Sequence, residues 1–99
     1  MIRIVKMHFR EEELESFLDM FQARKDLIAA FPGCHGVKLL QDIDDPTTVF
    51  TYSLWDGPDA LDAYRNSELF ADTWRLTKQR FRDKPAAWSV DEVSRALPK

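Results

Sequence analysis

The fold is decided by the stretch VFTYSLWDGP at residues 49–58, where a strongly β-prone run ends in a turn. β-Branched and aromatic residues dominate positions 49–55, a composition typical of a strand. Directly after it, Pro58 suits the first turn of a helix. On the other side, residues 42–47 are rich in turn formers and follow a second predicted strand at residues 34–41. The two strands are therefore expected to pair as an antiparallel hairpin with a long loop.

A strand and a helix precede that hairpin. Residues 2–9 form a β-branched and apolar run of strand length. In residues 11–31 the apolar side chains recur three, four or seven positions apart, which predicts an amphipathic helix. Glutamates at positions 11–13 would start this helix, because its first turn favours negative charge. Pro32 and Gly33 would end it, since proline disfavours a helical conformation in the residue before it and glycine permits a left-handed turn.

The hairpin is followed by a second helical region and a last strand. A short helix begins at Pro58, and Ser67 caps a longer one predicted over residues 68–82. Residues 86–93 form the last predicted strand, and residues 94–99 a polar tail. The order strand, helix, strand, strand, helix, strand predicts a single α+β domain over residues 1–99, with a ferredoxin-like βαββαβ subunit and a four-stranded antiparallel sheet.

Both faces of that sheet are predicted to be apolar. One parity of the strands carries Ile2, Ile4, Phe50, Tyr52 and Leu54. The other carries Val5, Met7, Phe9, Val49 and Trp55. Helices can cover only one face, so we expect a second copy of the chain to cover the other, giving a homodimer through the sheet face. Alternatively, a large apolar ligand covers that face. Periodicity does not determine which parity of the strands meets the helices.

Composition excludes several classes of partner. The 14 basic and 17 acidic residues give a net charge of −3, so no excess of cations is available for nucleic acid. No run approaches the roughly 18 apolar residues of a membrane helix, and we expect no secretory leader. The single cysteine, Cys34, rules out an internal disulfide and favours a reducing, cytoplasmic location.

Residues of the kind that bind metals do not form a metal motif here. His8 and His35 lie in separate predicted strands without a partner at metal-ligand spacing. Cys34 precedes His35 directly, and adjacent strand residues point to opposite faces, so the two cannot act as a pair. The acidic residues at positions 42, 44 and 45 lack the glycine and glutamate of a calcium loop and are interpreted as a solvated hairpin tip. The prediction is no metal.

Aromatic residues are the more informative set. They are Tyr52, Trp55, Tyr64, Phe70, Trp74 and Trp88. Tryptophan and tyrosine combine large flat faces with hydrogen-bonding tips, which suits an aromatic ligand. Most are expected in the core, with two or three lining a cleft between the sheet and the second helical region.

The chain resembles the antibiotic biosynthesis monooxygenase-like domains, which are dimeric α+β barrels of ferredoxin-like subunits. The resemblance is carried by FPGCHG at residues 31–36, TYSLWD at residues 51–56, and the run from Trp55 to Phe70. That run resembles the family's strand-end tryptophan, short helix, and Ser-x-x-Phe at the next helix. The resemblance covers nearly the whole chain and identifies the fold better than the activity.

The family includes cofactor-free oxygenases acting on polycyclic phenols, quinol oxygenases, haem-degrading monooxygenases and members without a known reaction. In the haem-degrading branch an asparagine, a tryptophan and a proximal histidine stand at positions that correspond approximately to Val5, Tyr64 and Trp74 here. The iron ligand is therefore missing, and the resemblance implies an enzyme without a cofactor.

The resemblance thus implies a cofactor-independent monooxygenase acting on a phenolic or quinol-type small molecule. For proton handling we predict Tyr64 and His8, with Tyr64 the better candidate if the odd-numbered face of the first strand meets the helices. Trp55 and Trp74 could donate an indole N–H or stack on the ring, and Phe70 and Tyr52 complete the predicted substrate-binding set. The alternative is a dimeric α+β barrel protein that binds a small molecule without catalysis.

Overall fold

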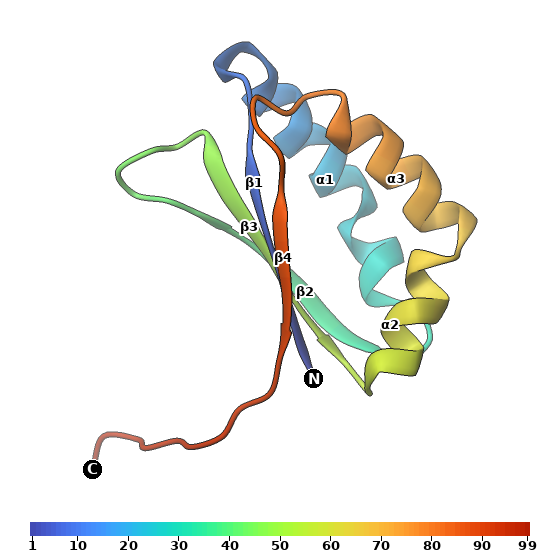
Figure 1. Cartoon of the computed structure of the whole chain (residues 1–99), viewed down its shortest axis with the longest axis vertical. Coiled ribbons are helices and arrows are strands. Elements are labelled where there is room, and N and C mark those ends of the chain that lie inside the picture. The colour runs from blue at the N-terminus through green and yellow to red at the C-terminus, as the bar shows by residue number, and fades with distance from the viewer.

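The computed structural model describes all residues from 1 to 99. Its elements are β1 (Ile2–His8), a 3-10 turn (Glu11–Glu13), α1 (Leu14–Ala29), β2 (Cys34–Gln41), β3 (Thr48–Trp55), α2 (Pro58–Arg65), α3 (Glu68–Lys78) and β4 (Ala86–Val90). The four strands form one antiparallel sheet in the order β2-β3-β1-β4, and the helices cover one of its faces (Figure 1). This is the predicted ferredoxin-like α+β architecture. No helix combines the length and the apolar character that a membrane span requires.

The register of the two central strands decides which side chains meet the helices. Met7 of β1 lies opposite Val49 of β3, and Ile4 lies opposite Tyr52. Met7 and Val49 are buried, whereas Ile4 and Tyr52 are only half-buried. Because successive strand residues point to opposite faces, the odd-numbered residues of β1 pack against the helices. The even-numbered residues form the other face, which we call the outer face.

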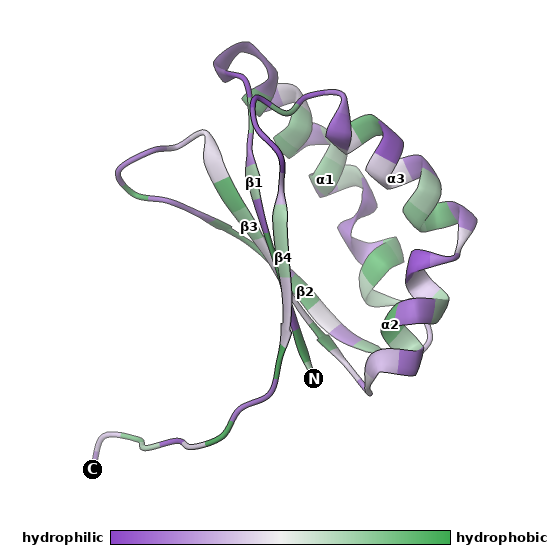
Figure 2. Ribbon diagram, viewed as in Figure 1, coloured by the Kyte–Doolittle hydropathy of each residue, from purple (hydrophilic) through white to green (hydrophobic).

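The core lies between the sheet and the helices. Its buried apolar residues are Met7, Phe9, Phe17, Phe21, Ile28, Val49, Trp55, Leu61 and Tyr64. Phe9 of β1 and Phe17 of α1 stack with ring centroids 4.1 Å apart, which joins the first strand directly to the first helix. Hydrophobic and hydrophilic segments alternate along α1 and α3, as expected of helices with one buried side (Figure 2).

The first helix is shorter than its pattern predicts. The three glutamates form a 3-10 turn, in which the backbone N–H of Glu13 donates to the carbonyl of Arg10 at 2.9 Å, and the α-helix begins only at Leu14. At the other end the helix stops at Ala29, and the N–H of Phe31 donates to the carbonyl of Ile28, three residues back. Such tightened turns are common at helix termini.

The predictions also extended α3 and β4 too far, and the neighbouring strand explains both errors. After Lys78 the chain turns to pair with the end of β1, where Phe81 bridges Phe9 and the N–H of Arg82 donates to the carbonyl of His8 at 2.8 Å. β4 ends at Val90 because its partner there, Ile2, is the first residue of β1. The predicted strand at residues 34–41 and the hairpin are confirmed.

The outer face of the sheet is apolar, as predicted from the two parities. Its most exposed large side chains are Leu40, Leu54, Trp88 and Val90, which are between 38% and 48% exposed. Tyr52 lies among them, with the ammonium group of Lys38 4.6 Å from its ring centroid. The three helices all lie on the opposite side (Figure 1).

Gly33 is required where α1 turns into β2. Its φ of +86° lies in the left-handed region, and a Cβ atom at this position would lie 2.5 Å from the Cβ of Ala60 in α2. The backbone of β2 and the start of α2 can approach this closely only because position 33 has no side chain.

Gly33→Ala should therefore destabilise the fold by about 1–3 kcal/mol, since it combines a strained φ with a steric clash. Gly57→Ala is the matched control, because Gly57 has an extended φ of 173° and open space around it. It should cost less than about 1 kcal/mol, the effect of changing a glycine N-cap. Urea denaturation of both variants measures the difference, and equal losses would contradict this role of Gly33.

Candidate functional site

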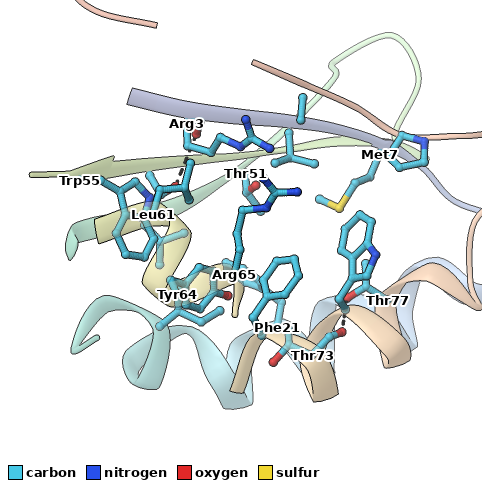
Figure 3. A pocket seen from close by; sticks show the side chains of 18 of the residues that line it. Arg3, Met7, Phe21, Thr51, Trp55, Leu61, Tyr64, Arg65, Thr73 and Thr77 are labelled. Atoms are coloured by element: carbon cyan, nitrogen blue, oxygen red, sulfur yellow. Dashed lines mark hydrogen bonds between the residues drawn. The ribbon is translucent and has the colours of Figure 1, made fainter. Parts of the chain in front are cut away.

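A cavity of about 270 Å³ lies between the sheet and the helices. β1 and β3 form one wall, and α1, α2 and α3 supply side chains opposite them (Figure 3). Most of its lining is apolar, with Met7, Phe21 and Leu61 among the contributors. A mostly apolar cavity with a few polar groups is the usual form of a small-molecule site.

One wall of this cavity is a continuous series of aromatic rings. The rings of Trp55 and Tyr64 stack with centroids 5.0 Å apart, and Phe70 meets Tyr64 edge-on at 5.2 Å. Phe70 in turn stacks on Trp74 at 5.9 Å. The structure therefore brings together four of the six predicted site residues, which come from β3, α2 and α3.

Ser67 holds the two helices that carry these rings. Its hydroxyl donates to the carbonyl of Tyr64 at 2.6 Å and accepts from the backbone N–H of Phe70 at 3.1 Å. The same side chain thus ends α2 and caps α3, as predicted for the Ser-x-x-Phe sequence. This single residue places Tyr64 and Phe70 at a shared corner of the cavity.

Tyr64 is buried, and its burial determines its protonation state. Desolvation raises the pKa of its phenol to about 12, with a smaller contribution from the neighbouring Cys34 thiol. At neutral pH the side chain therefore keeps its proton. Its hydroxyl makes no hydrogen bond within the chain, so it remains available to a ligand in the cavity. Tyr64 can donate a hydrogen bond there, and it cannot serve as a general base.

The two tryptophans differ in what they can offer. The indole N–H of Trp55 already donates to the hydroxyl of Ser53 at 2.9 Å, so this ring can only stack. The indole N–H of Trp74 has no partner within the chain. Of the two indole donors predicted from the sequence, Trp74 alone is available.

Two arginines reach the cavity, and they were missed in reasoning from the sequence. Arg3 stands on the odd-numbered face of β1, and Arg65 follows Tyr64 at the end of α2. The alternation along β1 could have placed Arg3 with Val5 and Met7 once the buried face was known. The lining includes no aspartate, glutamate, lysine or histidine.

His8 and Tyr52 do not reach the cavity. Both lie on the outer face of the sheet, opposite the side that carries Tyr64. The imidazole of His8 contacts the carboxylate of Asp83 through Nδ1 and the hydroxyl of Thr47 through Nε2, the latter at 3.1 Å. The structure thus satisfies the condition under which Tyr64 was the better candidate for proton handling.

The remaining chemical candidates have local structural partners. His35 contacts the carboxylate of Asp56, which joins the start of β2 to the end of β3. The thiol of Cys34 faces the carbonyl of Gly36 at 3.7 Å. In the hairpin loop, carboxylate oxygens of Asp45 accept from the hydroxyls of Thr47 and Thr48 at 2.6 and 2.9 Å. These residues stabilise turns and strand ends.

The cavity offers no imidazole to a haem. Neither histidine lines the cavity, so a haem iron there would lack the proximal imidazole of the haem-degrading branch. No group of three or more histidine, cysteine, aspartate or glutamate side chains is arranged to hold a metal ion.

Comparison with known proteins identifies a family. The sequence model of the antibiotic biosynthesis monooxygenase family matches residues 1–75. Similar solved structures include an antibiotic biosynthesis monooxygenase with a TM-score of 0.86 and 20% identity, covering 95% of this chain and 100% of that one. No curated protein sequence matches the chain.

Two further structures show the same fold in bacteria. Rv0793 from Mycobacterium tuberculosis has a TM-score of 0.85 at 16% identity, with 97% of each chain covered. PA3566 from Pseudomonas aeruginosa has a TM-score of 0.81 at 18% identity, covering 94% of this chain and 93% of that one. At such identities the likeness concerns the fold alone.

The raised pKa of Tyr64 can be measured directly. In a Tyr52→Phe variant Tyr64 is the only tyrosine, and its ultraviolet phenolate absorbance should appear with a midpoint at about pH 12. Because the folded-state pKa exceeds the unfolded one, the stability contributed by this group is fully present below about pH 10 and is lost as the pH rises through 12.

Tyr64→Phe is the reference for the stability measurement. Between about pH 10 and 12, the free energy of unfolding should fall more steeply with pH in the wild type than in this variant, as measured by denaturation in urea. A phenolate midpoint near pH 10, or parallel pH profiles, would contradict the burial assigned to Tyr64.

Proposed function

The chain belongs to the antibiotic biosynthesis monooxygenase family, and from this membership we propose that it is a cofactor-independent monooxygenase acting on a small phenolic or quinol-type aromatic molecule. The observation that carries the proposal is the cavity at Tyr64, where aromatic rings pack on a tyrosine whose hydroxyl has no partner within the chain. Aromatic walls favour a flat ring, and a free hydroxyl can orient an oxygen atom on it.

The size of the cavity supports a ligand of one or two rings. Its volume of about 270 Å³ exceeds the roughly 150 Å³ of an apolar protein cavity that binds benzene. Trp55 and Phe70 offer apolar ring surface, and Trp74 adds an indole N–H. A compact phenol or hydroquinone could be enclosed with most of its surface out of water.

In the proposed reaction the substrate itself supplies the electrons that reduce O2. After losing a proton, an electron-rich aromatic can pass electrons to O2, which reacts poorly with neutral closed-shell molecules. One oxygen atom then enters the substrate as a carbonyl at a ring C–H carbon ortho or para to the hydroxyl, and the other leaves as water with that hydrogen and the hydroxyl proton. All the electrons that reduce O2 come from the substrate, so no further reductant is needed.

The chain's contribution is a dry, polarised enclosure. Tyr64, which keeps its proton, donates a hydrogen bond to the negative charge that develops on the substrate oxygen or on reduced oxygen. Trp74 can provide a second donor from α3. The apolar lining excludes water, which strengthens both interactions and protects reactive intermediates. His8 and Tyr52 lie outside this proposal because they face away from the cavity.

A second candidate function is binding of the same kind of ligand without catalysis. The specific observation in its favour is that no carboxylate or imidazole lines the cavity, so no side chain there is an ordinary base at neutral pH. The two candidates make opposite predictions for oxygen consumption, and the same experiment decides between them.

Oxygen uptake tests the proposal. The purified chain, freed of metal, is incubated with hydroquinones and with phenols of one or two rings while dissolved oxygen is followed with an electrode. Enzyme-dependent uptake without added cofactor is expected, and Tyr64→Phe should lower its kcat about a hundredfold, the usual effect of losing one oxyanion donor. Tyr52→Phe removes the other tyrosine hydroxyl of the chain and should leave the rate unchanged.

Either of two results would overturn this assignment. Uptake that both tyrosine variants retain would remove Tyr64 from the reaction. Ligand binding by the wild type, with no uptake from any member of the panel, would favour the binding protein over the oxygenase.

We also propose that two copies of the chain pair through the outer face of the sheet. Four large apolar side chains are exposed there, and Trp88 alone is 48% exposed. A contiguous apolar surface of this kind usually marks an interaction site. Pairing would bury Trp88 against the same face of a second copy, as a two-fold interface requires.

Trp88→Arg should therefore convert a dimer into a monomer at micromolar concentration, because a buried interface tryptophan typically contributes about 2 kcal/mol or more. Light scattering coupled to size-exclusion chromatography measures the mass. Leu27→Arg is the matched control, since Leu27 is 59% exposed on α1, away from the sheet. A monomeric wild type, or a mass that only Leu27→Arg changes, would contradict the interface.

A further inference from the structure

Two positively charged side chains converge on the cavity from opposite walls. Arg3 extends from β1 and Arg65 from α2, and Figure 3 shows their side chains pointing toward one another into the space between the sheet and the helices. Thr51 and Phe21 line the same cavity. The apolar cavity therefore has one strongly cationic corner.

Neither guanidinium group has an acidic partner. Five other arginines of the chain form ion pairs: Arg10, Arg24, Arg75, Arg80 and Arg95. Arg3 has no carboxylate oxygen within 4.0 Å, and its hydrogen bond goes to the hydroxyl of Ser89 at 3.1 Å. Arg65 makes no side-chain hydrogen bond within the chain. Most of the donors on these two planar groups are therefore free to bind a ligand.

The charges around this corner leave positive charge in excess. Burial and repulsion from Arg65 lower the pKa of Arg3, while Asp62 of α2 acts in the opposite direction without reaching it as an ion pair. Tyr64 is neutral at physiological pH. β3, α1, α3 and β4 contribute only uncharged side chains to the cavity. Two like charges held together in this way are stabilised by an anion between them.

We propose that the cavity takes its aromatic ligand as an oxyanion, with the charged oxygen between Arg3 and Arg65 and the ring against the aromatic wall. This assignment rests on the proposed function for the kind of ring and extends it to the ionisation state of the substrate. The ligand class is an acidic phenol or enol that binds as its phenolate or enolate. Paired guanidinium groups are well suited to such an oxygen, since they combine charge with several directed donors.

The two arginines also explain how the substrate can be ionised in a cavity that has no basic side chain to accept its proton. Binding between them lowers the apparent pKa of the substrate hydroxyl, so the substrate releases its proton to bulk water or buffer as it enters the cavity, and the electron pair of the O–H bond remains on oxygen. No side chain needs to accept the proton. Tyr64 is then left to donate to the oxyanion or to reduced oxygen, the role that its own raised pKa permits.

The ionisation state of a bound ligand can be observed without turnover. The probe is 4-nitrophenol, whose ionised form absorbs visible light, titrated against the full chain. In the complex its apparent pKa should fall by about one unit. Arg3→Gln and Arg65→Gln should each reverse most of this shift and weaken binding about five- to tenfold, the effect of losing one charged hydrogen bond.

Three controls separate charge at this corner from general effects. Arg65→Lys retains the charge and should restore most of the shift. Arg82→Gln removes the same charge from an exposed arginine outside the cavity and should change nothing. Binding of 4-nitroanisole, which cannot ionise, should be the same in the wild type and in both cavity variants. An unshifted 4-nitrophenol in the wild type, or a shift that survives both cavity variants, would overturn the proposal.

A probe that is already ionised distinguishes a site for a ring carboxylate from a site for a phenolate. If 4-nitrobenzoate binds in an arginine-dependent way while 4-nitrophenol remains unshifted, the corner holds a ring carboxylate and the phenolate assignment is wrong. The oxygenase proposal and the anion-site proposal can fail independently of one another. Arginine-dependent ionisation without oxygen uptake would retain the anion site and remove the oxygenase, whereas uptake unaffected by Arg3→Gln and Arg65→Gln would retain the oxygenase and remove the anion site.

Discussion

The antiparallel pairing of β1 with β3, with Met7 opposite Val49, determines which side chains of the sheet lie under the helices. A slip of one residue between these central strands would exchange the two faces of the sheet. In the observed register Met7 and Val49 lie under the helices, and the same alternation brings Arg3 and Trp55 to that side. The cavity thus takes one ring of its aromatic wall and one arginine of its cationic corner from this strand pairing.

The stack of Trp55 on Tyr64 connects this sheet to the helical layer. Ser53 accepts the indole N–H of Trp55, which fixes the tryptophan as a flat surface. Tyr64 is buried against it, and the resulting desolvation keeps the phenol protonated. Packing therefore determines the protonation state of Tyr64. The site is organised to stabilise negative charge with donors, and it contains no side chain suited to removing a proton at neutral pH.

The two faces of the sheet have separate tasks in this arrangement. The face under the helices encloses the cavity, while the outer face presents apolar side chains such as Trp88 to a second copy of the chain in our proposal. His8 and Tyr52 belong to the outer face, although their residue types suit chemistry. The cavity and the surface proposed for pairing can therefore be altered independently by substitution.

Local physical chemistry was enough to determine much of this protein from its sequence. The order of elements, the hairpin and the Ser67 cap follow from periodicity, turn composition and side-chain capping, which act over a few residues. These features also indicated an apolar sheet on both faces and an aromatic cleft beside the second helical region. They could not show which parity of β1 is buried, because both parities are apolar.

The residues that line the site follow from long-range packing. It separated His8 from Tyr64, because the two faces of a sheet cannot contribute to one cavity. It also brought Arg3 and Arg65 together, since their meeting depends on how α2 packs over β1 rather than on any local pattern. Long-range contacts also explain why α3 and β4 end earlier than the sequence predicts. At both ends, pairing with β1 overrides the local propensity of the residues.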